Sequence, residues 1–310
     1  MLIYTLKRLA EALPTLLVVI LLAFLLTRAA PGGPFDEEQA MPPEVRANLE
    51  RSYGLDAPLH EQFLRYLGGL LRGDFGPSFT FKDYSVSELI AEGLPTSAAL
   101  GGAALLLAVL AGIPLGLVAA LRARGWLDRL AMGLAVGGIA LPVFVIGPLL
   151  VLVFGVYLDL VPVAGWGEGA WLDRILPTVT LALPIVAYLA RLTRGSVLEV
   201  LQSPFVMAAK ARGVARHSLI LRHVLPAAMV PVIGYLGPAS AAILTGSLVV
   251  EILFGIPGIG RHLVMGALNR DYTLVMGMVI LYASSMILAN LVADLGCAAV
   301  DPRIRLGRRR

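Results

Sequence analysis

Long apolar runs dominate this chain and restrict what it can fold into. Lipid offers no hydrogen-bond partner to a peptide group, so a segment that crosses a bilayer must satisfy its own backbone, as a helix of roughly 20 apolar residues does. Six such runs lie at residues 9–27, 98–121, 130–156, 175–190, 227–250 and 273–300. Hydrophobic residues make up 58% of the chain and charged residues only 15%. The sequence therefore predicts an all-α, polytopic membrane protein with six transmembrane helices.

Prolines interrupt the third and fourth runs. Pro142 and Pro148 mark the third, and Pro177 and Pro184 lie in the short fourth run. Proline removes a backbone donor and crowds the preceding turn, so kinked helices packed against neighbours are expected.

The first run follows basic residues, as the apolar region of a signal peptide does. However, this run is too long for such a region, and Arg28 occupies the place where a cleavage site needs a small residue. We therefore interpret the run as an uncleaved membrane anchor.

Basic residues are distributed unevenly between the two sides of the predicted membrane. With the first residue inside, the four cytoplasmic pieces 1–8, 122–129, 191–222 and 301–310 carry 16 of the 25 Lys and Arg. The outer pieces carry the remainder in roughly twice the length. Cytoplasmic loops of membrane proteins are enriched in basic residues. Both termini are therefore expected in the cytoplasm.

These runs and loops divide the chain into four parts. Residues 1–30 form an N-terminal transmembrane helix, and 31–94 an extracytoplasmic segment with short helices expected near 42–54 and 59–71. Residues 95–301 form a five-helix core that contains a cytoplasmic loop over 191–226, and 302–310 form a basic tail.

The motifs of catalysis and metal binding are absent from the sequence. No lysine follows a glycine anywhere in the chain, so it cannot build the phosphate-binding loop of an ATPase. The four histidines lack metal-ligand spacing, and the single cysteine excludes an intrachain disulfide. Bases are not interleaved with aromatic residues, which argues against nucleic acid as a partner. We expect no enzyme activity, cofactor or metal in this chain, with an intramembrane enzyme as a remote alternative.

The 191–226 loop contains a short predicted helix with small residues on it. Ser203 and Pro204 suit the N-cap and first position of a helix over 205–212, and Gly213 suits the left-handed conformation that ends one. Phe205 starts this helix. Ala208, Ala209 and Gly213 carry almost no side chain and leave a surface that another protein could approach, with Lys210, Arg212 and Arg216 around it. A second amphipathic piece follows, up to a Leu-Pro stop at Leu225 and Pro226. The alternative is a solvated loop whose only role is its positive charge.

This loop resembles the signature of ABC importer membrane subunits. That signature has Glu-Ala-Ala, three residues, Gly, nine residues, Ile, one residue and Leu-Pro, and the matching positions are Ala208, Ala209, Gly213, Leu225 and Pro226. The chain departs from the signature at two positions, because Met207 replaces the Glu and His223 replaces the Ile. A pairing made through that Glu therefore cannot be carried over to this chain.

Further matching stretches extend over nearly the whole chain and resemble the peptide and nickel importer branch. They are LTRAAPGGPF, RGDFGPSFTFKDYSVSELI, ARLTRGSVLEVLQSPFVMAAKARG, VVEILFGIPGIGRHLVMGALNRDY and DPRIR. The outer stretches are most similar to the first (B-type) membrane subunit of oligopeptide importers. The alternatives within the branch are importers of dipeptides, nickel or another small solute.

The resemblance implies a type I importer permease fold in the bacterial cytoplasmic membrane, forming half of an alternating-access path for peptides. It implies a second permease subunit, two ATPases that bind ATP and Mg²⁺, and an extracytoplasmic peptide-binding protein as partners. The helix begun by Ser203 would be a coupling helix seated in a groove of an ATPase. An ion-coupled carrier is the rival class, but it would place several ionisable groups within spans and carry an inverted repeat.

One acidic residue at the outer end of the fifth run suggests part of the transport path. Glu251 precedes a Gly- and Pro-rich turn, and an ionisable group at this depth is a functional candidate. We expect an outer gate or path formed by Glu251, Phe254, Pro257 and Gly258. The alternative is a structural ion pair of Glu251 with Arg261 or Arg270.

Small residues and one further acid indicate packing. Gly112 with Gly116, and Gly133 with Gly137, have the spacing of close helix contacts. Asp294, near the inner end of the last run, is expected to form a structural ion pair.

Overall fold

The described part of the protein is built from helices and the turns between them. The computed structural model describes residues 2–30, 54–81, 83–167 and 171–300, together with residues 44, 48 and 51. Within these residues the β-type pairing is limited to one isolated bridge between Pro77 and Ser85. The predicted all-α class is confirmed for this part of the chain. The helix expected near 42–54 lies mostly outside the described residues, and the basic tail lies wholly outside them.

The elements follow one another along the chain with short connections. They are α1 (Leu2–Ala29), α3 (Leu59–Leu70), α4 (Val86–Leu121), α5 (Trp126–Ala140), α6 (Val143–Leu150), the π-helix η1 (Val151–Tyr157), the 3₁₀-helix η2 (Trp171–Arg174), α7 (Ile175–Leu201), α8 (Pro204–Ala211), α9 (Arg216–Leu219), the π-helix η3 (Ile220–Val224), α10 (Leu225–Phe254), α11 (Ile259–Leu268) and α12 (Tyr272–Val300).

Five helical stretches of the described chain are long and apolar enough to cross a membrane. They are Thr5–Ala29, Val86–Leu121, Trp171–Leu201, Arg216–Phe254 and Tyr272–Val300. The pair Trp126–Ala140 and Val143–Tyr157 makes a sixth if a broken pair counts as one span. All six predicted runs fall on these stretches. The fourth is longer than predicted, because α7 stays helical past the apolar run as far as Leu201.

The third predicted run is broken, where a kink was expected. Its two halves differ in direction by 110°. Leu141 and Pro142, between α5 and α6, both adopt extended backbone conformations. Proline disfavours helical geometry in the residue before it and cannot donate a backbone hydrogen bond, so Pro142 ends α5. Pro148 lies inside α6.

The chain divides into two compact units. Unit 1 comprises Met1–Ala10, Ser97–Ile256 and Ser285–Arg310, and unit 2 comprises Glu11–Thr96 and Pro257–Ser284. Most of α1, the 31–94 segment and α11 therefore belong to unit 2. The 191–226 loop belongs to unit 1.

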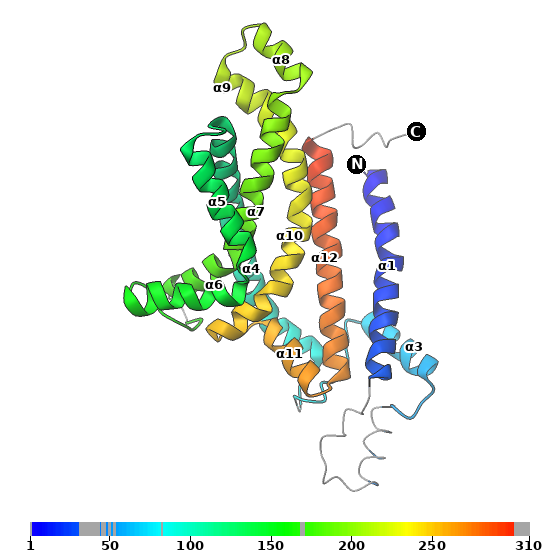
Figure 1. Cartoon of the computed structure of the whole chain (residues 1–310). Coiled ribbons are helices and arrows are strands. Elements are labelled where there is room, and N and C mark those ends of the chain that lie inside the picture. Colours follow the sequence, from blue (N-terminus) through cyan, green and yellow to red (C-terminus); the bar gives the residue numbers. More distant parts are fainter. Residues whose placement is uncertain are drawn as a thin grey trace. The chain divides into compact units, whose positions relative to one another are not determined.

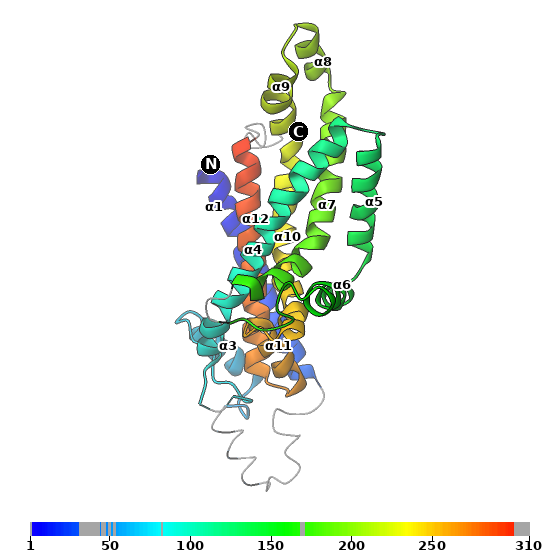
Figure 2. The same cartoon turned by 90° about the vertical axis from the view of Figure 1, so that its left-hand side faces the viewer.

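Helix α7 is central to unit 1 and packs against α5, α6 and α10 (Figures 1 and 2). A Cβ atom added at Gly112 of α4 would lie 2.9 Å from the Val186 carbonyl oxygen of α7, and one at Gly116 would collide with the Ala190 carbonyl oxygen. The close contact predicted for these two glycines is thus confirmed between α4 and α7. Gly133 and Gly137 have no such neighbour within 4 Å in the part of the chain that is described.

Unit 2 is held together by one buried carboxylate as well as by apolar packing. Asp271, fully buried just before α12, accepts hydrogen bonds from the Ser78 hydroxyl (2.5 Å) and from the backbone N–H groups of Phe79 (2.8 Å) and Thr80 (2.9 Å). Its second oxygen accepts from Thr273 and Leu274, both at 3.0 Å. These bonds tie the loop after α3 to the start of α12.

Candidate functional site

Helix α8 begins where the sequence predicted it. Ser203 has extended φ and ψ angles of −70° and 148°, and Pro204 is the first helical residue. The Ser203 hydroxyl does not cap α8, because it donates instead to the Val200 carbonyl oxygen at 2.6 Å. The same hydroxyl therefore holds the end of α7, and the first turn of α8 relies on proline.

Helix α8 ends at Ala211, and Gly213 follows its C-cap Arg212 in the left-handed conformation that was predicted to stop the helix. Gly213 has a φ of +77°, in the left-handed region, and its N–H donates to the Lys210 carbonyl oxygen at 3.0 Å. The next N–H, of Val214, donates to the Ala209 carbonyl oxygen at 3.3 Å. A Cβ at Gly213 would meet no described atom within 4 Å. Glycine is therefore needed here for its backbone conformation and not for space.

We expect Gly213→Ala to destabilise the loop by about 1 kcal/mol, because alanine resists a positive φ. Gly195→Ala is the matched control, since Gly195 lies in α7, also has open space around its Cα and has helical geometry. That control should instead stabilise its helix by about 0.5–1 kcal/mol. Thermal unfolding of the two variants in detergent measures both changes. A Gly213→Ala variant as stable as the control would contradict the conformational role.

Burial corrects the surface expected for α8. Ala209 is fully buried, in a cluster with Val197 of α7, Val206 of α8 and Leu219 of α9. It therefore faces its own chain and does not contribute to an exposed face of small residues. The reason is that α8 packs back on the ends of α7 and α9, which places one side of the short helix inside.

The exposed side of α8 is apolar as well as basic. Phe205 and Met207 are 49% and 56% exposed, and Ala208, Lys210 and Arg212 are exposed with them. Figures 1 and 2 both show α8 and α9 beyond the ends of α7 and α10, projecting from the rest of unit 1. This exposed face is available to another protein.

The piece after Gly213 joins the next span without a break. Residues Arg216–Phe254 are helical throughout, passing from α9 through η3 into α10. Pro226 therefore lies in the first turn of α10 and is not a stop, which corrects that expectation. Proline cannot donate to the carbonyl four residues earlier. The π-helical spacing of η3 lies where that bond is missing.

An ion pair between the buried Asp128 and the partly exposed Arg194 holds the start of α5 against α7, close to the loop. The Arg194 guanidinium donates through Nε to Asp128 Oδ1 at 2.5 Å and through a terminal nitrogen to Oδ2 at 2.8 Å. The Arg124 backbone N–H adds a bond at 2.8 Å to the same Oδ2. Sequence reasoning missed this pair. The sequence does show an acidic residue, Asp128, within a basic connection between two apolar runs. Nothing local identifies Arg194, 66 residues later, as its partner.

Glu251 and Phe254 are both 1% exposed and lie inside unit 1. The Ser97 hydroxyl of α4 donates to Glu251 Oε1 at 2.6 Å. The two side chains pack in the core of their unit. Their role in an outer gate or path stays a prediction. Pro257 and Gly258 belong to unit 2, where Gly258 is the buried N-cap of α11 and Pro257 is exposed.

Asp294 forms the expected structural pair, with Arg8 of α1 at 3.1 Å. Among the described residues, no group of three His, Cys, Asp or Glu side chains has the arrangement of a metal site.

The geometry and sequence define the class as a polytopic helical membrane protein with a projecting loop helix. The family model described as "Binding-protein-dependent transport system inner membrane component" matches residues 112–306. The chain belongs to this family of ABC transporter permeases, which are transport components.

Two groups of characterised relatives align over nearly the whole chain. The oligopeptide transport system permease protein OppB of Escherichia coli (strain K12) is 48% identical over 305 residues, covering 98% of this chain and all of that protein. OppB of Salmonella typhimurium has the same identity and coverage. The dipeptide transport system permease protein DppB of Bacillus subtilis is 41% identical over 306 residues, covering 99% of each chain.

Proposed function

We propose that this chain is the permease subunit of an ATP-driven peptide importer and forms half of its translocation path. The observation that carries the proposal is the 48% identity to an oligopeptide permease along 98% of the chain. The preferred substrates are oligopeptides. Dipeptides are a second candidate class, which the relative in Bacillus subtilis supports at 41% identity.

The energy for transport would come from partner subunits. The sequence has no phosphate-binding loop, so ATP and Mg²⁺ would be bound by two ATPase subunits. A second, similar permease would complete the path, and an extracytoplasmic binding protein would deliver the peptide. A ligand that binds one conformation better shifts the equilibrium toward it, and ATP supplies that difference in affinity.

Helix α8 would be the contact with the ATPases. Its exposed residues Phe205, Met207 and Ala208 offer apolar surface for a groove, with Lys210 and Arg212 beside them. Its buried residues Val206 and Ala209 attach it to α7 and α9. The helix is therefore built to transmit force, because one side is free for a partner while the other is fixed to the spans.

Substitutions at two adjacent alanines of α8 distinguish a role in coupling from a role in holding the loop together. Ala208→Glu adds bulk and negative charge on the exposed side of α8, and we expect a folded protein that loses co-purification of the ATPases and loses peptide uptake. Ala209→Glu buries a charge in the cluster with Val197, and we expect it to destabilise the loop itself. Uptake into vesicles, ATPase co-purification and thermal unfolding are measured on both variants.

Ser218→Glu is a control for charge, because it adds the same group to the same loop in α9 and not in α8. Peptide binding to the separate binding protein should be unchanged in every case. Near-normal uptake and ATPase retention by Ala208→Glu would contradict the coupling role. They would support the alternative that the loop is solvated and acts only through its positive charge.

We further propose that both termini lie in the cytoplasm and that the 31–94 segment lies outside. The uneven distribution of Lys and Arg supports this orientation. His60 of α3 and His217 of α9 are both exposed, so His60→Cys and His217→Cys make a matched pair for labelling. The parent for both is Cys297→Ser, because Cys297 is the single native cysteine.

An impermeant thiol reagent added to intact cells is expected to label the cysteine at position 60 and to spare the one at position 217. After the cells are permeabilised, both should react. Labelling of position 217 in intact cells would reverse the proposed orientation.

A further inference from the structure

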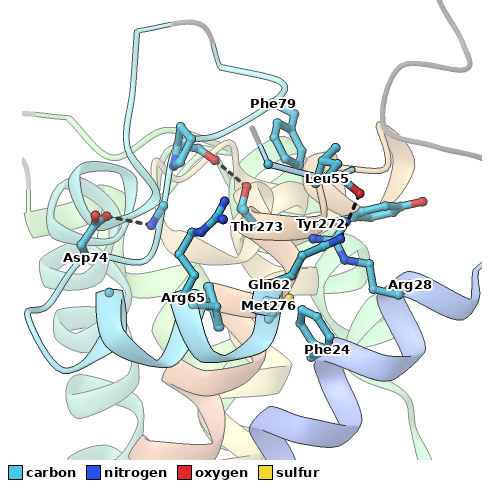
Figure 3. A pocket seen from close by; sticks show the side chains of 15 residues that line it. Phe24, Arg28, Leu55, Gln62, Arg65, Asp74, Phe79, Tyr272, Thr273 and Met276 are labelled. Carbon is cyan, nitrogen blue, oxygen red and sulfur yellow. Dashed lines mark hydrogen bonds between the residues drawn. The ribbon is translucent and has the colours of Figure 1, made fainter. Parts of the chain in front are cut away.

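A cavity of about 210 Å³ lies in unit 2, between the last turn of α1, helix α3 and the start of α12 (Figure 3). Arg28 reaches into it from α1, and Arg65 reaches into it from α3. Phe24 and Met276 contribute apolar walls. The cavity therefore combines two guanidinium groups with a partly apolar lining.

Three buried polar atoms of the lining have no hydrogen-bond partner among the described residues. They are Arg28 Nε, the Tyr66 hydroxyl and Gln62 Oε1. Gln62 is fixed in orientation, because its Nε2 donates to the carbonyl oxygens of Leu55 (2.9 Å) and Ala57 (2.7 Å). Buried polar groups are normally paired. Arg28 Nε and the Tyr66 hydroxyl are donors and favour a ligand that brings acceptor oxygens, whereas Gln62 Oε1 accepts and would pair with a water or a headgroup hydroxyl.

The charges of the lining favour an anion. Arg28 and Arg65 outnumber the single carboxylate, Asp74, which accepts a hydrogen bond from the Gly76 N–H at 2.8 Å. The Arg28 guanidinium carbon lies 5.5 Å from the ring centres of both Phe24 and Tyr272, and these rings hold it in place. Burial and the nearby Asp74 raise the pKa of the Tyr66 hydroxyl, which therefore remains an O–H donor.

The position of the cavity along α1 favours a lipid as the source of that anion. Arg28 lies in the last turn of the apolar stretch Thr5–Ala29, where a transmembrane helix reaches the headgroup layer. Leu22, Leu25 and Leu26 are exposed on the preceding turns and offer a surface for acyl chains. At that level a pair of guanidinium groups can form charge-assisted hydrogen bonds to the phosphate of a lipid headgroup.

We propose that this cavity binds the phosphate group of an anionic phospholipid, with Arg28 and Arg65 as its charged partners and the Tyr66 hydroxyl as a further donor. The lipid joins the end of α1 to α3 and the start of α12. This site is separate from the 191–226 loop and does not depend on the transported substrate.

Native mass spectrometry of the full-length protein, titrated with phosphatidylglycerol or with phosphatidylcholine of the same acyl chains, tests the proposal. The parent should bind phosphatidylglycerol at least tenfold more tightly than phosphatidylcholine. The double variant Arg28→Gln/Arg65→Gln should lose at least tenfold of that affinity and should no longer distinguish the two lipids. Arg51→Gln/Arg72→Gln, which removes the same charge from exposed positions nearby, should bind like the parent.

A second pair of variants tests the site even if the double arginine variant does not fold. Tyr66→Phe keeps the ring and removes only the hydroxyl, and it should weaken phosphatidylglycerol binding severalfold. Tyr84→Phe, at an exposed tyrosine, is its control and should have no effect. Phosphatidylglycerol should raise the melting temperature of the parent but not that of Arg28→Gln/Arg65→Gln.

Three results would overturn the proposal. The first is equal binding of the two lipids by the parent. The second is displacement of phosphatidylglycerol by millimolar inorganic phosphate, which would identify a site for the free ion. The third is displacement by a short peptide, which would identify a site for the peptide carboxylate.

Discussion

Replacing Asp271 by alanine is expected to destabilise unit 2 by at least ~3 kcal/mol, because it removes the acceptor of several buried donors at once. The Ser78 hydroxyl and the Phe79 and Thr80 N–H groups share one oxygen of this carboxylate. Without it, the loop after α3 loses these three bonds to the residue before α12 and keeps the hydrogen bond from the Thr273 hydroxyl to the Pro77 carbonyl oxygen. Thermal unfolding in detergent and protease cleavage within residues 74–81 measure the two effects.

Asp271→Asn should fall between the parent and the alanine variant, since an amide keeps one acceptor oxygen but brings a donor that faces other donors. Asp56→Ala is the control, because Asp56 is an exposed aspartate of the same unit. If Asp271→Ala unfolds at the same temperature as Asp56→Ala, the carboxylate does not hold the loop.

Replacing Arg194 by methionine is expected to cost about 1–3 kcal/mol, because the buried Asp128 carboxylate loses its charged partner and keeps only the bond from the Arg124 N–H among those described. The methionine keeps most of the apolar stem, so the loss reports the charge. Arg191→Met, one turn earlier on α7 and exposed, should change stability by less than about 0.5 kcal/mol. Thermal unfolding of the two variants gives the difference.

The double variant Asp128→Leu/Arg194→Met sharpens this test. Replacing a buried pair by apolar residues of similar size is often neutral or stabilising, so the double variant should recover most of the stability lost in the single one. A double variant as unstable as Arg194→Met would mean that the arginine contributes through packing and not through its charge.

The positions of the spans could be predicted because they depend on composition. A run of about 20 apolar residues has few alternatives to a membrane helix, and five of the predicted runs fall on one long helical stretch each, while the third falls on a broken pair. The ends of the helices depend on neighbours and were less well predicted. The continuation of α7 past Arg191 and Arg194 is an example, because Arg194 is held by Asp128 from another helix.

Within the 191–226 loop, local signals succeeded and non-local ones failed. Pro204 and Gly213 act through their own backbone angles, so their places at the two ends of α8 could be read from the sequence. The burial of Ala209 depends on Val197 and Leu219, which reach it only in the folded chain. Likewise, nothing near Glu251 in the sequence indicated that Ser97 would donate a hydrogen bond to it.

The uninterrupted helix from Arg216 to Phe254 has a consequence for how far a small rotation reaches. Its 39 residues correspond to about 58 Å at 1.5 Å per residue. A tilt of about 5° at the α8 end would therefore move the opposite end by about 5 Å if the helix stayed stiff. Pro231 and Pro238 lie inside this helix and remove backbone hydrogen bonds. The stiffness of the helix at these two prolines therefore determines how far Glu251 moves when the helix tilts at Arg216.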